Sequence, residues 1–477
     1  MAMGVFEGHM TKMADGFKAI RIAELELRGE YSTQTHDDFF RYFNWQQFTD
    51  DEFQLCPPVT VVGGDGALYD IGFQNLSRAM MSGKPLKVVV LDTQVYSNTG
   101  GQACTSGFFG QVSDMAPFGK AKPGKQEIRK EIGLIAMAHR TTYVMQSTIA
   151  YPHHMIEGFI EGLNSRRPAL FNCYTSCQPE HGIGDDMGHQ QAKLAVESRA
   201  YPLFRYNPDK GKTPQECFTL ETNPAKHDNW PSYKLNYIEH GQHKHMQLPL
   251  TFADFAMTEG RFRKHFRTMP ADTWHENMIP LVDYVELPTA DREEKVPFIW
   301  SIDKQQKLSR LFVSESMVKS TEDRRDFWIM LKAIAGVTAK TDTSESLEEK
   351  IRCDVITKIA NGLMQLAESG QSDIAIGNAE VSSEIKTQQA AADDYMAPWL
   401  DTEECTACGE CINLNPEMFA YNENEKAYIK DADAGPYQDL VKAAERCTAK
   451  VIHPGLPKNR HEPGIDQWIQ RGAKYNV

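Results

Sequence analysis

The first regular pattern of apolar and polar positions in the chain predicts a strand, a helix and a second strand. The β-branched run at 59–62 stops at a Gly-Gly-Asp-Gly turn, which is typical of a buried parallel strand that leads into a helix. Residues 69–82 carry apolar side chains at helical spacing and stop before Gly83 and Pro85. Residues 86–91 are again apolar and β-branched. The pattern therefore predicts one βαβ unit.

Further units of the same kind follow along the chain. We expect strands at 141–146 and 169–174, with a helix at 152–164 between them. Because crossovers of this length return each strand parallel to the last, the carboxyl ends of the strands share one edge of the sheet. The polar residues at those ends are Asp65, Asp92, Ser147 and Thr175. The sequence predicts an α/β fold with a doubly wound, mostly parallel sheet.

The pattern also suggests where the chain divides. A strand at 297–300 and a helix at 315–335 are expected in the middle of the chain, and Ser346 to Glu349 forms a capping box that opens a helix to about residue 369. Polar residues without apolar periodicity then indicate a linker. The predicted parts are a domain at 1–215, an extension packed on it at 216–342, a helix and linker at 343–395, a small α+β domain at 396–456 and a tail at 457–477.

Composition and charge narrow the classes of function. The 477 residues include 65 acidic and 51 basic side chains, and the resulting net charge of −14 argues against binding to nucleic acid or to an anionic membrane. No apolar run approaches the length of a membrane span, and the first residues lack the pattern of a secretion signal. We expect a cytoplasmic protein without a membrane span, with small molecules and other proteins as partners.

The turn after the first strand and the loop after the second offer oxygen ligands. Asp65 supplies a carboxylate, Thr93 a hydroxyl, Val95 a carbonyl and Asn98 an amide, all hard ligands that suit Mg²⁺ together with phosphate oxygens. The surrounding glycines allow backbone N–H groups to approach an anion closely. This combination indicates a magnesium-diphosphate site, although an ordinary turn between strand and helix would carry some of the same residues.

Two stretches, 64–72 and 91–102, resemble the thiamine-diphosphate segment of the pyruvate:ferredoxin oxidoreductase family. The resemblance implies that Asp65, Thr93 and Val95 hold Mg²⁺ and that Asn98 lies near the reacting carbon as a catalytic residue. The cofactor-binding residues that it implies are Gly64, Asp65, Gly66, Ala67, Thr93, Val95, Tyr96, Ser97, Asn98 and Thr99.

The segment 174–183 resembles another part of the same family, in which a cysteine ligates the [4Fe–4S] cluster nearest the thiazolium. It implies that Cys177 ligates a cluster shared with another chain, and the alternative is an inert thiol. We expect Cys173 to be buried within its strand. We expect His181 to be a loop histidine without a chemical role.

Near the carboxyl end, Cys405, Cys408 and Cys411 are spaced to hold three corners of an iron–sulfur cubane, and Cys447 can close it. Zinc is the alternative, but zinc sites usually pair two separate C-x-x-C knuckles. Position 415 is Asn rather than a further Cys, so one cluster is expected. The expected hairpin around 422–424 and helix at 437–446 resemble single-cluster bacterial ferredoxins, a small ferredoxin-like α+β fold.

Taken with the resemblance, these features imply a subunit of a 2-oxoacid:ferredoxin oxidoreductase, most of all one that acts on pyruvate. Such an enzyme uses thiamine diphosphate, Mg²⁺ and iron–sulfur clusters, forms acyl-CoA from the 2-oxoacid and coenzyme A, and reduces ferredoxin or flavodoxin. We expect larger partner chains to supply the pyrimidine-binding domain and the remaining ligands of the shared cluster. The alternatives are an electron-transfer subunit on a non-catalytic thiamine-type scaffold and a non-oxidative thiamine enzyme, which would have no use for the clustered cysteines.

Overall fold

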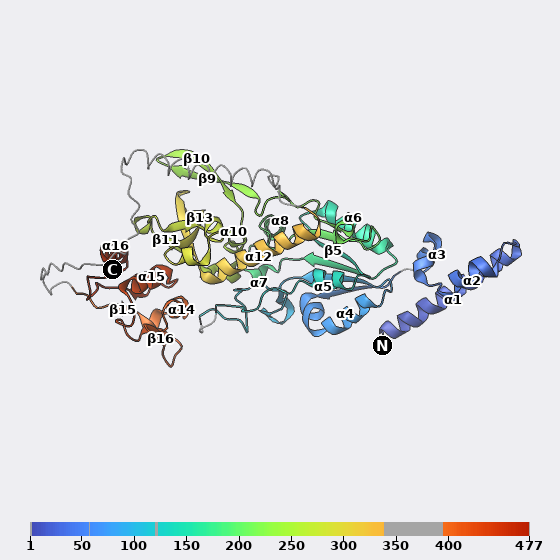
Figure 1. The fold of residues 1–477 in the computed structure, drawn as a ribbon, viewed down its shortest axis with the longest axis horizontal. Helices are drawn as coiled ribbons and strands as arrows, with labels where there is room; N and C mark the ends of the chain where they lie inside the picture. Colours follow the sequence, from blue (N-terminus) through green and yellow to red (C-terminus); the bar gives the residue numbers. More distant parts are fainter. Residues whose placement is uncertain (1, 57, 120–122, 338–394, 477) are drawn as a thin grey trace, which may run out of the picture.

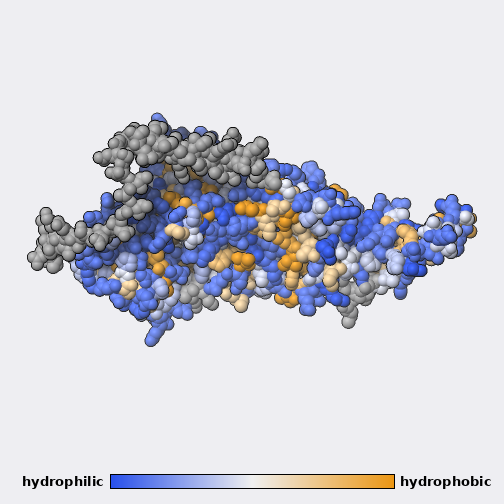
Figure 2. All heavy atoms as spheres, viewed as in Figure 1, coloured by the Kyte–Doolittle hydropathy of each residue, from blue (hydrophilic) through white to orange (hydrophobic). Residues whose placement is uncertain are grey.

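The computed structural model describes residues 2–56, 58–119, 123–337 and 395–476. Figure 1 shows an elongated molecule, with an amino-terminal helical arm at one end, an α/β body in the middle and a small carboxyl-terminal module at the other end. On the face drawn in Figure 2, apolar residues gather in the middle of the molecule and both ends are mostly polar. None of the helices within the described ranges is both long and apolar enough to cross a membrane.

The body contains a six-stranded sheet in the order β1-β2-β6-β5-β7-β8. The first four strands in this order are parallel, and β7 and β8 continue the sheet antiparallel. The predicted α/β class with a mostly parallel sheet is therefore confirmed. The strands are β1 (Thr60–Gly64), β2 (Lys87–Asp92), β5 (Tyr143–Thr148), β6 (Ala169–Tyr174), β7 (Phe204–Tyr206) and β8 (Phe218–Thr219).

Helices cover the two faces of this sheet unequally. The core on one face joins strand residues such as Val90 and Leu170 to α4 (Phe73–Met81), α5 (Ile132–Ala138) and α12 (Glu315–Ile334). The core on the other face includes Phe171 and Met145, and it is closed by Met155 and Phe159 of α6 (Pro152–Asn164). This second core reaches β2 only at Val89 and does not include β1.

Two predictions for the first βαβ unit were wrong in detail. The strand β1 was expected to be buried, but it is an edge strand whose Val61 and Val62 are 41% and 61% exposed, because it pairs only with β2. The helix expected at 69–82 is divided into a π-helical turn, η2 (Gly66–Ile71), and α4. Gly72 lies between them, and a Cβ atom there would come within 2.6 Å of the Ala67 carbonyl oxygen.

The amino-terminal arm has a small core of its own, which includes Met10, Phe48 and Phe53. It contacts the body through Trp45, whose indole N–H donates to the Gly83 carbonyl at 3.0 Å, and through an ion pair between Arg166 and Asp50. Its helices are α1 (Ala2–Leu27), α2 (Thr33–Arg41), η1 (Trp45–Gln47) and α3 (Asp50–Leu55).

The extension carries a four-stranded sheet in the order β11-β14-β13-β12 and a hairpin of β9 and β10. Its helix α12 places Phe327, Trp328 and Leu331 in the same core as the six-stranded sheet. The strands are β9 (Ser232–Glu239), β10 (Gln242–Pro249), β11 (Phe266–Met269), β12 (Met278–Pro280), β13 (Val296–Ile302) and β14 (Leu308–Val313). Shorter helices in the second half of the body are α7 (Gln178–His181), α8 (Gly188–Glu197), α9 (Pro214–Cys217), α10 (Phe252–Ala256), η4 (Gly260–His265), η5 (Ala271–Thr273), α11 (Leu281–Tyr284) and η6 (Thr289–Arg292).

The carboxyl-terminal module packs short strands and helices around one core. The expected hairpin and helix are present, and α16 adds Ile465 and Trp468 of the predicted tail to that core. The helix and linker predicted at 343–395 fall almost entirely outside the described residues. The elements of the module are β15 (Trp399–Leu400), η7 (Thr402–Glu404), α14 (Glu410–Leu414), β16 (Phe419–Tyr421), β17 (Ala427–Ile429), α15 (Tyr437–Arg446), β18 (Ile452–His453), α16 (Ile465–Gly472) and η8 (Ala473–Tyr475).

Candidate cofactor edge and iron–sulfur pocket

The oxygen atoms proposed to bind Mg²⁺ lie together at the carboxyl edge of the sheet, where β1 and β2 end. The Asp65 carboxylate accepts hydrogen bonds from the Val95 N–H at 3.1 Å and from the Thr93 hydroxyl at 3.3 Å. The Thr93 hydroxyl also lies 2.9 Å from the Val95 carbonyl oxygen. The fold therefore gathers a carboxylate, a hydroxyl and a carbonyl from two separate loops into one cluster of hard ligands.

The charges around these oxygen ligands favour a bound cation. Asp65 is 3% exposed, and burial together with the nearby Asp92 carboxylate raises the pKa of Asp65 to about 6, against hydrogen bonds from Ser106, Gly66 and Val95. Asp92 is paired with the buried guanidinium of Arg129. Within the described part of the chain, no cationic side chain pairs with Asp65. A divalent metal ion would supply the missing positive charge, so these residues fit the predicted magnesium.

The remaining residues of the predicted cofactor segment line the rim of this cluster. They lie on β3 (Val95–Tyr96), η3 (Ser97–Thr99) and β4 (Gln102–Ala103). Tyr96 donates to Asp70 at 2.7 Å, and its ring covers Gly66 so closely that a Cβ atom on that glycine would lie 2.5 Å from it. Ser97 donates to the Thr93 hydroxyl at 3.0 Å. The predicted residues Gly64, Ala67, Asn98 and Thr99 are exposed to solvent.

One sequence-based expectation at this edge was wrong. His181 was expected to lie in a loop and to have no chemical role, but it ends the short helix α7 and is fully buried. Its Nε2 atom lies 2.8 Å from the Thr93 carbonyl oxygen, and its Nδ1 atom lies 3.4 Å from Glu259. The imidazole thus supports the backbone of Thr93, a predicted metal ligand.

The support extends through two further side chains that the sequence did not reveal. Arg261 donates to the Glu259 carboxylate at 2.6 Å and to the Gln94 side chain at 2.6 Å. Burial acts to raise the pKa of Glu259, but Arg261 and His181 outweigh it and hold the pKa at about 2. The ionised Glu259 carboxylate therefore holds the loop 93–95 through His181 and Arg261. No spacing rule could have found Glu259, because 78 residues separate it from its partner His181 in the chain.

The two cysteines at the end of β6 differ in their surroundings. Cys173 is buried within the strand, as predicted, and burial raises the pKa of its thiol to about 12. Cys177 is half-buried at the start of α7, on the cofactor edge. Among the described residues, no group of three or more His, Cys, Asp or Glu side chains is arranged to hold a single metal ion. Cys177 therefore has no set of companion ligands among the residues that the structure describes.

The carboxyl-terminal module surrounds an apolar pocket with all four predicted cluster cysteines, which are Cys405, Cys408, Cys411 and Cys447. Backbone N–H groups of Ala407 and Ala427 point to the Cys405 sulfur at 3.2 and 3.3 Å, and the N–H of Val451 points to the Cys447 sulfur at 3.4 Å. Hydrogen bonds of this kind stabilise the thiolates of iron–sulfur clusters.

The cysteines also indicate which kind of metal centre the pocket would hold, an iron–sulfur cluster or a zinc ion. Burial raises the pKa of Cys408 to about 12, so a cationic centre is needed to hold the thiolate. Zinc sites usually pair two separate C-x-x-C knuckles. Here Cys405, Cys408 and Cys411 follow one another at intervals of three residues, and Cys447 lies 36 positions further on. This spacing favours a multi-iron cluster over zinc.

Comparisons with known proteins match both regions of the chain. Residues 53–173 match the family model for the C-terminal TPP binding domain of thiamine pyrophosphate enzymes, and residues 400–454 match the 4Fe-4S single cluster domain of Ferredoxin I. Apart from Cys177, the residues proposed for the two sites fall within the matched ranges.

Among curated relatives, pyruvate:ferredoxin oxidoreductase of Moorella thermoacetica is 38% identical over 34% of this chain and 14% of its own length. Pyruvate-flavodoxin oxidoreductase of Trichormus variabilis is 37% identical over 37% of this chain and 14% of its own. Pyruvate dehydrogenase [NADP(+)] of Cryptosporidium parvum is 34% identical, also over 37% of this chain, but over 10% of its own. The matched part is therefore about one seventh or less of each relative.

A solved 2-oxoglutarate:ferredoxin oxidoreductase from Magnetococcus marinus aligns over 27% of this chain and 43% of its own, with 21% identity and a TM-score of 0.23. Taken together, the two matching family models identify residues 53–173 as a thiamine pyrophosphate-binding domain and residues 400–454 as a single-cluster 4Fe-4S ferredoxin domain.

Proposed function

We propose that this chain is a subunit of a 2-oxoacid:ferredoxin oxidoreductase, with pyruvate as the favoured substrate and acyl-CoA and CO₂ as products. The proposal rests on two features of one chain. One is a buried carboxylate that has no cationic partner among the described residues and lies beside two further oxygen ligands. The other is a pocket lined by four cysteines. A non-oxidative thiamine enzyme would need only the first of these sites. Two of the relatives are named as pyruvate oxidoreductases, which supports the choice of pyruvate as the substrate.

In this proposal each residue of the cofactor edge has a definite task. Asp65, Thr93 and Val95 would hold Mg²⁺ together with the diphosphate, and backbone N–H groups at 64–67 would bind phosphate oxygens. Tyr96, Ser97 and Thr99 line the same rim, and Asn98, which is exposed there, is free to approach the reacting carbon. When bound, thiamine diphosphate supplies the carbon nucleophile and the electron sink for decarboxylation.

In this proposal the iron–sulfur clusters held by the cysteines carry the electrons away from the cofactor. Cys405, Cys408, Cys411 and Cys447 hold one [4Fe–4S] cluster, and Cys177 offers a single thiolate to a cluster completed by another chain. One thiolate cannot hold a cubane, so the second cluster requires outside ligands. Ferredoxin or flavodoxin is the proposed final acceptor and coenzyme A the acyl acceptor.

We further propose that larger partner chains complete the enzyme. The relatives are several times longer than the segment that this chain matches, so other domains accompany this segment in them. The exposed edge of β1 and an apolar stripe on α6, formed by Ile156, Ile160 and Leu163, offer a surface for a partner that carries the pyrimidine-binding domain. The proposed location is the cytoplasm, with no role for nucleic acid.

The alternative is an electron-transfer subunit whose thiamine-type fold is only a scaffold. A scaffold would not need to keep Asp65 buried and without a cationic partner next to Thr93, because burying such a group is costly. The arrangement therefore favours a working cofactor site.

The proposal is tested by purifying the chain alone and with the proteins that co-purify from its source. Reduction of a viologen dye is then followed with pyruvate, 2-oxoglutarate or branched 2-oxoacids in the presence of coenzyme A. We expect turnover only in the complex, and fastest with pyruvate. Turnover by the chain alone would refute the need for partners, and a complex without thiamine-dependent turnover would refute the enzymatic function.

A further inference from the structure

Arg267 on β11 reaches from the body into the carboxyl-terminal module. Its side chain is buried, and its two terminal nitrogens donate to the carbonyl oxygens of Cys447, Glu445 and, at 3.4 Å, Ala444. These carbonyls end helix α15, and one of them belongs to a cluster ligand. The carboxyl end of a helix carries partial negative charge, which suits a guanidinium.

The charge of Arg267 nevertheless has no carboxylate partner within the described ranges. The carboxylate of Glu445 is bound instead by Arg471, at 3.0 and 2.8 Å, and lies 3.2 Å from His275. A buried charge without a counter-ion is costly, so one is expected nearby. The hydrogen bond from Arg267 to the Cys447 carbonyl oxygen places the guanidinium beside the backbone of one cluster ligand.

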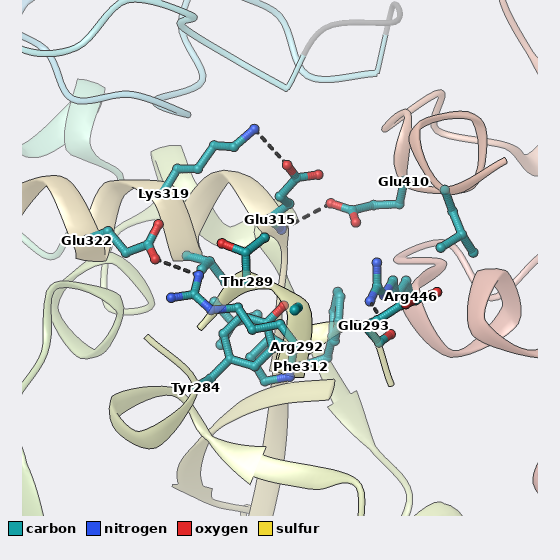
Figure 3. A pocket seen from close by; sticks show the side chains of 15 residues that line it. Tyr284, Thr289, Arg292, Glu293, Phe312, Glu315, Lys319, Glu322, Glu410 and Arg446 are labelled. Atoms are coloured by element: carbon teal, nitrogen blue, oxygen red, sulfur yellow. Dashed lines mark hydrogen bonds and ion pairs between the residues drawn. The ribbon is translucent and has the colours of Figure 1, made fainter. Parts of the chain in front are cut away.

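Other contacts hold the module in the position that this arginine requires. Gly119 of the body lies so close to Thr406, between two cluster cysteines, that a Cβ atom on the glycine would lie 2.2 Å from the Thr406 carbonyl oxygen. Figure 3 shows a second junction, where Glu410 of the module points toward the start of α12 and accepts a hydrogen bond from the Glu315 N–H at 3.2 Å. A pocket of about 470 Å³ lies between α12 and Arg446 at this junction.

We infer that Arg267 is the counter-ion of the cluster held by Cys405, Cys408, Cys411 and Cys447, and that the body thereby raises the reduction potential of the module. A cubane with four thiolate ligands is an anion, and reduction adds one more negative charge. A fixed, buried cation stabilises the reduced form more than the oxidised form. The potential is then a property of the whole chain, because the module on its own lacks this charge. The inference rests on the proposed function only in that the module carries an iron–sulfur cluster.

The test uses the full chain, reconstituted anaerobically with iron and sulfide and titrated with dithionite while the reduced cluster is followed by electron paramagnetic resonance. Arg267→Gln keeps a hydrogen-bond donor but removes the charge, and we expect its midpoint potential to shift to more negative values. Arg267→Lys keeps the charge, and we expect a potential close to that of the wild type. Arg292→Gln serves as the control, because Arg292 lies at the same junction but is already paired with Glu322 at 2.7 Å.

The inference is overturned if Arg267→Gln binds four irons per chain and titrates at the wild-type potential. It is equally overturned if Arg267→Lys shifts as far as Arg267→Gln, since the charge would then not be the cause. Should Arg267→Gln fail to fold, Arg267→Lys and Arg267→Met decide in the same way. No thiamine diphosphate or 2-oxoacid is present, so failure of the thiamine chemistry leaves the result unaffected, and a wild-type chain that binds no iron would refute the iron–sulfur proposal instead.

Discussion

The iron–sulfur pocket and the cofactor edge differ in how far one chain completes them. The pocket is enclosed by residues of one module, and three of its cysteines, Cys405, Cys411 and Cys447, are about 5–6% exposed. At the cofactor edge Asp65 is buried, but Asn98 and the neighbouring strand β1 are open to solvent. The comparison indicates that this chain supplies all the residues of the iron–sulfur pocket but only part of the cofactor site.

The largest expected effect is at the cofactor edge. Asp65→Ala should abolish magnesium-dependent binding of thiamine diphosphate, because the metal loses its only carboxylate ligand in this set. Isothermal titration of the assembled complex measures the loss. Asp114→Ala, at an exposed site in the next loop, should bind the cofactor as the wild type does. Unchanged binding by Asp65→Ala would remove Asp65 from the metal site.

The second prediction distinguishes the iron–sulfur pocket, which this chain completes, from the cluster proposed to be shared through Cys177. Cys411→Ala should lose most of the roughly four irons expected per chain, because a cubane needs its fourth thiolate for stable binding. Cys177→Ala should retain that iron in the isolated chain, since none of the described residues joins Cys177 in a set of metal ligands. Iron analysis with absorption spectroscopy measures both variants. Two clusters in the isolated wild-type chain, or zinc in place of iron, would contradict this picture.

The third prediction concerns the open side of the cofactor edge. Val62→Lys should weaken assembly with the partner chain by more than about tenfold, because a lysine would have to leave water at an apolar interface. The substitution should hardly change the stability of the free chain, since Val62 is already 61% exposed. Leu27→Lys on the amino-terminal arm is the matched control. Equal affinities for wild type and Val62→Lys, measured by light scattering or co-purification, would place the interface elsewhere.

The smallest effect on function is expected at Glu259, which supports the loop 93–95. The folded-state pKa of Glu259 is about 2, below its ordinary value of 4.5, so its contribution to stability is present above pH 4.5 and is lost as the pH falls toward 2. Urea unfolding should therefore show Glu259→Gln to be less stable than wild type at pH 7, with a gap that narrows below pH 4.5. A gap that does not depend on pH would exclude this account, and Glu197→Gln on α8 is the control.

The elements that local pattern determines were predictable from the sequence. Helices α6 and α15 and strand β6 have the predicted limits, because their apolar periodicity agrees with local breakers such as Pro152 and Pro168. The spacing of the cluster cysteines was equally local. A run of valines, by contrast, does not reveal whether a strand lies inside a sheet or at its edge, so β1 was assigned to the interior.

Contacts between distant parts of the chain were not predictable. His181 meets Glu259 only because α7 and η4 pack together, and Arg267 meets Cys447 across 180 positions of sequence. Each of these residues is an ordinary polar side chain in its own segment. Their roles follow from the tertiary fold, and no local signal marks them.

The open edge of β1 has a consequence for how the chain behaves before it assembles. An exposed, β-branched edge strand presents unpaired N–H and C=O groups that can pair with the edge of any other strand. At high concentration the free chain should therefore self-associate through this edge. Binding of the partner would then protect the chain from aggregation as well as complete its cofactor site, and co-expression should raise the yield of soluble protein more than any change in the core.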